Sequence, residues 1–164
     1  MDDNKLRKIA GVLVGITVVL FVVALLIPEP EPVPDYSGPL DEAAVKKLLP
    51  RSERDAEISG SLSSGDVVVT RELSENLTPA MMLSGGRMHS IEIFKNFFED
   101  PRIEKVLVVS NLEFVDTFGQ TSSGAGCWYS VTRETADKVN WDNLPLENLD
   151  KIADAYFIHP ALRG

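Results

Sequence analysis

Residues 9–27 form an uninterrupted apolar run, and this run constrains the fold of the chain more than any other segment. It holds 19 residues without a charge, and Thr17 is its only polar side chain. At about 1.5 Å per residue, a helix of this length spans roughly 28 Å, close to the ~30 Å hydrocarbon core of a bilayer. A helix also satisfies its own backbone polar groups, as lipid requires. The run therefore predicts a membrane-spanning helix.

The charges on either side of the run predict its orientation. Three basic side chains precede it and three acidic ones follow: Lys5, Arg7, Lys8, Glu29, Glu31 and Asp35. Short basic flanks stay in the cytoplasm, so we expect residues 1–8 to be a cytoplasmic tail and the C-terminal part to be extracytoplasmic, in the periplasm of a bacterium. A cleaved signal peptide is the alternative. The run is longer than the usual 7–15-residue signal core, and no small-x-small site precedes Pro28, which favours an uncleaved signal anchor.

The run also carries a helix-packing pattern. Gly11 and Gly15 are four residues apart, and Val18 and Val22 continue the same helical face. Small residues at this spacing let a second membrane helix approach closely, although glycine is also common in membrane helices generally. The pattern predicts a contact with other membrane subunits.

The remaining chain is expected to form one tethered domain. Residues 28–39 are rich in proline, which favours an extended linker, and residues 40–164 suit one domain with one core. The whole chain has 25 acidic and 16 basic residues, for a formal charge of −9. This balance argues against nucleic acid as a partner and suits either a solvated surface or a basic protein. A spanning helix remains in contact with the lipid bilayer.

Periodicity and turn signals predict an α+β domain in which an antiparallel hairpin packs against helices. Helices are expected at 40–49, from Thr78 to the glycine pair Gly85–Gly86, at 87–99 and at 143–157. Strands are expected at 67–70, 103–118 and 127–133, with a hairpin connection at 119–126.

No catalytic or cofactor motif stands out. His89 and Glu92 are three residues apart on an expected helix, but a metal site would need Asp116 or His159 as well. Cys127 with a histidine and Asp116 contains the residue types of a thiol hydrolase, as does almost any chain of this composition. We therefore predict no catalytic, cofactor-binding or metal-binding residues. The lone Cys127 is expected to be a buried core residue.

Trp128 and Trp141 are the candidate interface residues of the outer domain, because a partly exposed tryptophan is typical of protein interfaces. A helix covering their face is the alternative. The sequence favours a non-catalytic accessory or assembly subunit of a larger membrane complex. A membrane-tethered ligand-binding domain with Met82, Met88 and Phe94 around its pocket is the second hypothesis, and a thiol-dependent hydrolase is the third.

Overall fold

The computed structural model describes residues 36–73, 78–115 and 117–163. Within these ranges no helix is both long enough and apolar enough to cross a membrane. The longest, with 19 residues, contains Arg87, Glu92 and Lys95. This finding contradicts the membrane-spanning part of the expected fold class and the single-pass localisation, and both are corrected here.

The segments on which the membrane prediction was placed lie outside the described residues. They include the expected tail 1–8, the expected span 9–27 with Gly11, Gly15, Val18 and Val22, and most of the linker 28–39. The chain divides into two units, residues 1–35 and residues 36–164, and all the described residues belong to the second.

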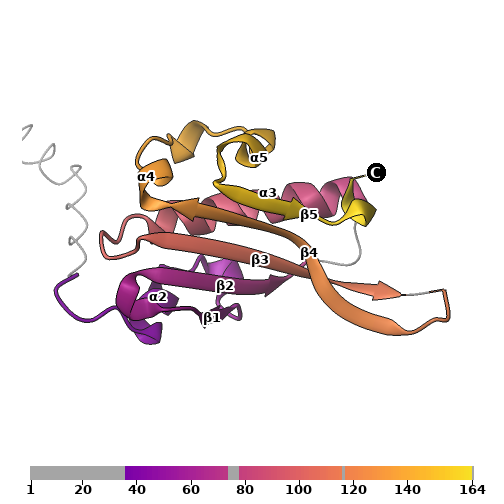
Figure 1. The fold of residues 1–164 in the computed structure, drawn as a ribbon, viewed down its shortest axis with the longest axis horizontal. Helices are drawn as coiled ribbons and strands as arrows, with labels where there is room; N and C mark the ends of the chain where they lie inside the picture. The colour runs from indigo at the N-terminus through magenta and orange to yellow at the C-terminus, as the bar shows by residue number, and fades with distance from the viewer. Residues whose placement is uncertain (1–35, 74–77, 116, 164) are drawn as a thin grey trace, which may run out of the picture. The chain divides into compact units, whose positions relative to one another are not determined.

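The described residues form one five-stranded mixed sheet with the order β1-β2-β3-β4-β5. Its strands are β1 (Glu57–Ser59), β2 (Asp66–Glu72), β3 (Lys105–Val115), β4 (Thr121–Thr132) and β5 (Ala155–Ile158). Strands β2 and β3 are parallel, and every other neighbouring pair is antiparallel. Figure 1 shows β3 at the centre of the sheet.

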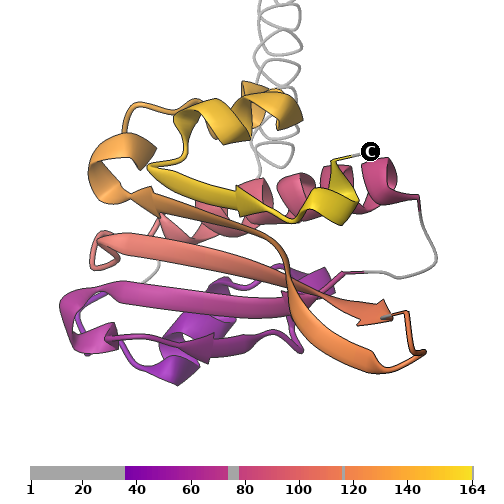
Figure 2. The ribbon, with the colours of Figure 1, turned by 45° about the vertical axis from the view of Figure 1, so that its right-hand side comes forward.

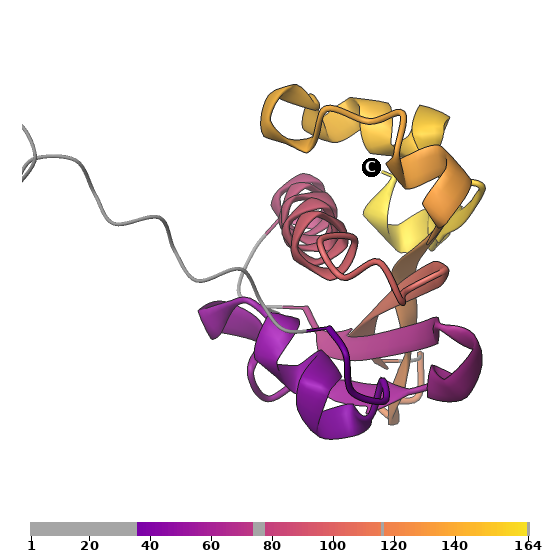
Figure 3. The ribbon, with the colours of Figure 1, turned by 90° about the vertical axis from the view of Figure 1, so that its left-hand side faces the viewer.

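Helices and 3₁₀ turns connect and cover these strands. They are α2 (Glu42–Leu48), η1 (Arg51–Glu53), η2 (Leu62–Ser64), α3 (Pro79–Phe97), α4 (Arg133–Ala136), η3 (Trp141–Asn143), η4 (Leu146–Asn148), α5 (Leu149–Ile152) and η5 (Pro160–Leu162). Figures 2 and 3 show the long helix α3 running along one face of the sheet.

Helix α3 is the crossover between the parallel strands β2 and β3. Thr78 begins it by accepting a hydrogen bond from the backbone N of Met81, and Pro79 occupies the first helical position. Its buried residues recur at helical spacing and form the side that packs on the sheet: Leu83, Gly86, Ser90, Ile91, Ile93, Phe94 and Phe97. The opposing sheet residues are also buried: Val67, Val69, Val106, Val108, Cys127, Tyr129 and Val131.

The predicted helix break at Gly85–Gly86 is wrong, because α3 continues through both glycines. Gly86 faces the sheet, where an added Cβ would lie only 2.8 Å from Sγ of Cys127. The missing side chain at Gly86 lets the helix approach β4 closely.

The predicted helix at 143–157 is also wrong. Only residues 149–152 are α-helical, and Ala155–Ile158 pairs with β4 as strand β5. Its apolar residues Tyr156, Phe157 and Ile158 favour a strand, and β4 offers the backbone partner. The helical spacing of apolar residues in this segment predicted a helix, but residues 155–158 pair with the distant strand β4 instead.

Strands β3 and β4 continue past the end of β2 as a two-stranded arm. The last pair between β2 and β3 is Glu72 with Asn111, whereas β3 and β4 stay paired as far as Val115 with Thr121. The arm protrudes from the sheet in Figure 1. Val115 is 68% exposed and Phe118 in the connection is 86% exposed.

Candidate protein-docking surface

The face of the sheet opposite α3, here called the open face, carries a row of side chains that crosses all five strands. The strand register aligns Glu57, Thr70, Val109, Trp128 and Phe157, in order from β1 to β5. Successive residues of a strand point to opposite faces, so these side chains point away from the buried residues on either side of them. Figure 1 looks onto this face, with α3 behind the sheet.

A second row lies two residues along the strands, and it adds aliphatic surface. It aligns Ser59, Val68, Leu107, Ser130 and Ala155. Val68 and Leu107 are partly exposed, like Val109 and Trp128 of the first row. Among the described residues, the partly buried apolar side chains that pack on the core do not include any of these four. The open face is therefore apolar at its centre without being part of the core.

The aromatic end of the open face is a stacked pair. The rings of Trp128 and Phe157 lie 6.3 Å apart between centroids with an interplanar angle of 22°, and Phe157 is 36% exposed. Aromatic pairs of this kind bury each other partly and leave one side of each ring for another contact.

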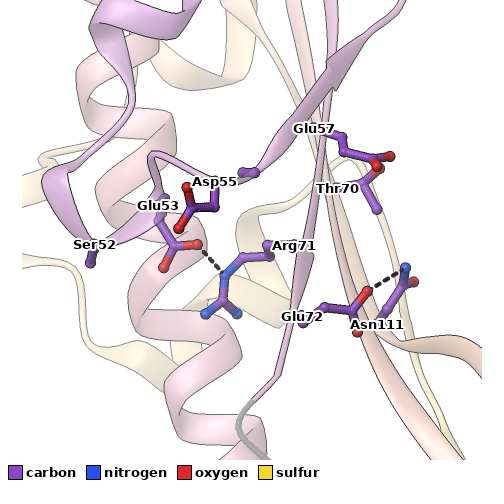
Figure 4. Close-up of a pocket in the computed structure, with 9 residues that line it drawn as sticks. Ser52, Glu53, Asp55, Glu57, Thr70, Arg71, Glu72 and Asn111 are labelled. Atoms are coloured by element: carbon purple, nitrogen blue, oxygen red, sulfur yellow. Dashed lines mark hydrogen bonds and ion pairs between the residues drawn. The ribbon is translucent and has the colours of Figure 1, made fainter.

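The other end of the first row enters a cleft of about 520 Å³, which we call the acidic cleft (Figure 4). It is lined by Ser52, Glu53, Asp55, Ala56, Glu57, Thr70, Arg71, Glu72 and Asn111. The lining holds four carboxylates and one guanidinium group, and Figure 4 shows Arg71 directed toward Glu53 and away from Glu57 and Glu72. Because Glu57 and Thr70 belong to both surfaces, the acidic cleft is continuous with the open face.

The guanidinium of the acidic cleft is already paired. Nε of Arg71 donates to Oε2 of Glu53 at 2.6 Å, and Nη1 donates to Oγ of Ser110 at 3.3 Å. Both ionic side chains are at least nine-tenths buried. Nδ1 of His89 approaches Oε1 of Glu53 to 2.8 Å but makes no hydrogen bond. The hydrogen-bonded group therefore ties η1 to β2 and β3.

A second, partly buried ionic group holds the C-terminal segment on α3. Arg87 donates two hydrogen bonds to Asp150, at 2.9 and 2.5 Å, and the Tyr129 hydroxyl donates to the same carboxylate at 3.1 Å. Burial raises the pKa of Tyr129 far above its usual value, with further contributions from Cys127 and Asp150. The phenol therefore stays protonated and serves as a structural donor.

The structure does not assemble the thiol site considered from the sequence. Cys127 is fully buried, as predicted, and burial raises the pKa of its thiol. A buried, protonated thiol is a poor nucleophile. The rings of His159 and Phe114 lie 4.3 Å apart between centroids in a tilted arrangement, His89 lies beside Glu53, and Asp116 lies outside the described residues.

The metal and ligand-pocket hypotheses gain no support from the described residues. No group of three potential ligands able to hold a metal occurs among them. Phe94 is fully buried, Met82 packs against the core and Met88 is 49% exposed, so the three do not line a common pocket. Met88 instead lines a shallow groove on α3 with Met81, Ala80, Ser84, Gly85 and Leu146.

The two tryptophans occupy different places. Trp128 lies on the open face, whereas Trp141 packs against Phe94 and Phe98 at 5.8 and 6.5 Å between ring centroids. Sequence reasoning missed Val68, Leu107, Val109 and Phe157. The signal was present in the consecutive apolar residues 67–69 and 106–109, which give side chains to both faces of their strands.

Comparisons with protein-family models, with curated proteins and with solved structures gave no match to this chain.

Proposed function

We propose that this chain is a non-catalytic accessory or assembly protein that contacts another protein through the open face. The observation that carries the proposal is the partly exposed row Val109, Trp128 and Phe157, flanked by Val68 and Leu107. Contiguous apolar surface of this kind on a folded domain is a recognised mark of protein contacts, and tryptophan is the residue most enriched in their energetic centres.

The composition of the central strands supports the same proposal. A strand with one solvated face normally alternates apolar and polar residues, whereas unbroken apolar runs are typical of strands covered on both faces. Residues 67–69 of β2 and 106–109 of β3 are unbroken apolar runs. Their core-facing members meet α3, and a partner protein would cover the others.

The buried state of Cys127 argues against the thiol hydrolase considered earlier. The acidic cleft is polar, and its only guanidinium is held by Glu53. A small-molecule pocket usually has predominantly apolar walls with a few polar groups. Protein docking is therefore the function that these surfaces support best.

The test is native mass spectrometry of the full chain purified from its own cells at native abundance. We expect a stoichiometric complex that the double variant Trp128→Ser/Phe157→Ser reduces more than about tenfold, because interface aromatics commonly contribute 2 kcal/mol or more each. Met81→Ser/Met88→Ser is the matched control, because it removes two exposed apolar side chains from α3, 54% and 49% exposed. A lone monomer, or a complex insensitive to the open-face variant, would refute the proposal.

A further inference from the structure

The carboxylates beside the open face indicate the chemistry of its partner. We propose that the open face receives a basic amphipathic helix of a partner protein, whose apolar stripe covers Leu107, Val109 and Trp128 and whose Lys or Arg side chains reach Glu57 and Glu72. This inference rests on the proposed function and specifies the partner of the same surface.

The charges around the acidic cleft are unbalanced within the domain. Among the described residues, no lysine, arginine or histidine lies within ion-pair distance of Asp55, Glu57 or Glu72. Glu72 accepts one long hydrogen bond from Asn111, at 3.4 Å, and Arg71 is occupied by Glu53. Cations from another molecule would complete this end of the open face.

The charge is also unevenly distributed along the strands. Lys105, the cation on this face, stands at the opposite end of β3, where the register places it next to Asp66. The apolar rows lie between that end and Glu72, and Glu57 lies beside the first row on the edge strand β1. A partner covering the rows therefore meets Glu57 on its β1 side and Glu72 at the end away from Lys105, where we expect its basic side chains to lie.

A second copy of this chain is a poor occupant. The chain has a formal charge of −9, so two copies repel each other at long range. Each copy would also bring the same carboxylates to the contact. A basic partner is attracted by the same field, and complementary charge speeds its association.

The dimensions of the open face fit a helix aligned with β3. Strands lie about 4.8 Å apart and a helix is about 10–12 Å wide, so one helix covers β2 to β4. The distance along β3 from Leu107 to Asn111 is four residues, or about 13 Å, which is two to three helical turns. The opposite face of the sheet is covered in the same way by α3.

The experiment uses two 18-residue helical peptides with the same leucine stripe, one with lysine and one with glutamate at its polar positions. Each is fluorescently labelled, and its binding to the full chain is followed by anisotropy. We expect the lysine peptide to bind at least about tenfold more tightly than the glutamate peptide, and its affinity to fall as salt rises. Equal affinity for the two peptides, or no binding of either, overturns the inference.

Two double variants localise the effect. Glu57→Gln/Glu72→Gln should weaken binding of the lysine peptide about three- to tenfold, because each substitution removes one exposed ion pair with the peptide. Glu92→Gln/Glu147→Gln changes the net charge equally at two exposed positions outside the open face and the acidic cleft, and should have no effect. If both variants weaken binding equally, general attraction to the acidic chain explains it and the inference fails.

The remaining outcomes separate this inference from the proposed function. If Trp128→Ser/Phe157→Ser leaves the lysine peptide bound, the peptide binds elsewhere and the inference is overturned. If the chain alone sediments as a dimer that this variant dissociates, a second copy is the occupant and the inference is again overturned. In either case the native complex, and its sensitivity to the same variant, still decides whether the chain is an accessory protein.

Discussion

The two faces of the sheet are built from alternate residues of the same strands, yet they have opposite fates. On the face under α3, Val67, Val106, Val108 and Tyr129 are at most 1% exposed. On the open face, Val68, Leu107, Val109 and Trp128 are partly exposed. The side chains of the two sets are of comparable size and polarity.

Apolar composition alone does not define the core of this domain. The set under α3 is buried because the crossover helix between β2 and β3 must pass over one face of the sheet. The other set has no covering helix among the described residues. This set is the surface proposed above to meet a partner protein, so the two faces are expected to respond differently to substitution.

The largest difference is expected in stability. Phe94→Ala removes a fully buried ring of α3, and should lower the free energy of unfolding by about 3–5 kcal/mol. Phe157→Ala removes the same side chain from the open face, where it is 36% exposed, and should cost less than about 1.5 kcal/mol. Urea denaturation of both variants measures the gap. Similar losses would mean that the open face is part of the core.

The next largest effect concerns the contact between α3 and the sheet. Gly86→Ala places a methyl group 2.8 Å from Sγ of Cys127, and should destabilise the fold by about 1–3 kcal/mol. Gly85→Ala has no atom within 4 Å of the added carbon, and should stabilise the fold by up to about 1 kcal/mol through helix propensity.

Thermal unfolding distinguishes the two glycine variants, and Cys127→Ala supplies the control. Removing Sγ should recover much of the loss caused by Gly86→Ala in the double variant. If the loss persists unchanged, the cause is not the close approach to Cys127.

Some features of the core side of the domain could be predicted from local signals in the sequence. The start of α3 was predictable from Thr78 and Pro79, and the burial of Cys127 followed from its residue type and strand context. The alternation of Val106 and Val108 located the core face of β3. These features depend on residues close in the chain.

Features that depend on distant partners were not predictable in the same way. Strand β5 forms by pairing with β4, and position 86 of α3 requires a glycine because an added Cβ would lie too close to Cys127. The open face was missed because only Val106 and Val108 of β3 were assigned to an apolar face. Leu107 and Val109, which point to the other side of the strand, are also apolar. The membrane assignment was drawn from residues 9–27, which lie outside the described residues. It is corrected by the finding that no helix among the described residues is long and apolar enough to span a membrane.

A smaller effect is expected in acid, where Asp100, which is paired with Arg102, should differ from Asp55 of the acidic cleft, which has no ion pair among the described residues. Asp100 is 1% exposed, and burial alone would raise its pKa. Hydrogen bonds from Arg102 and the charges of Arg102 and Arg133 outweigh burial and hold the pKa of Asp100 below its usual value. Asp100 therefore stabilises the fold above the unfolded pKa of about 4, and this contribution is lost as the pH falls through the lower folded pKa.

Asp100→Asn should accordingly lower the free energy of unfolding at pH 7 and flatten its decline below about pH 4. Urea denaturation from pH 7 to pH 2 measures both. Asp55→Asn in the acidic cleft controls for the amide and should change the value at pH 7 by less than about 0.5 kcal/mol. An unchanged acid profile in Asp100→Asn would show that other groups dominate acid unfolding.

The smallest effect is expected where the open face meets the acidic cleft. Glu57→Gln/Glu72→Gln removes two carboxylates that have no cation within ion-pair distance among the described residues, so the free energy of unfolding should change by less than about 0.5 kcal/mol at 150 mM salt. At low salt the variant should be slightly more stable than the parent chain, because the substitutions remove the repulsion among the carboxylates of the acidic cleft. Urea denaturation at two salt concentrations measures this. A loss above about 1 kcal/mol would show that these carboxylates stabilise the domain itself. Their presence beside the open face would then no longer support the proposal that this face binds a partner.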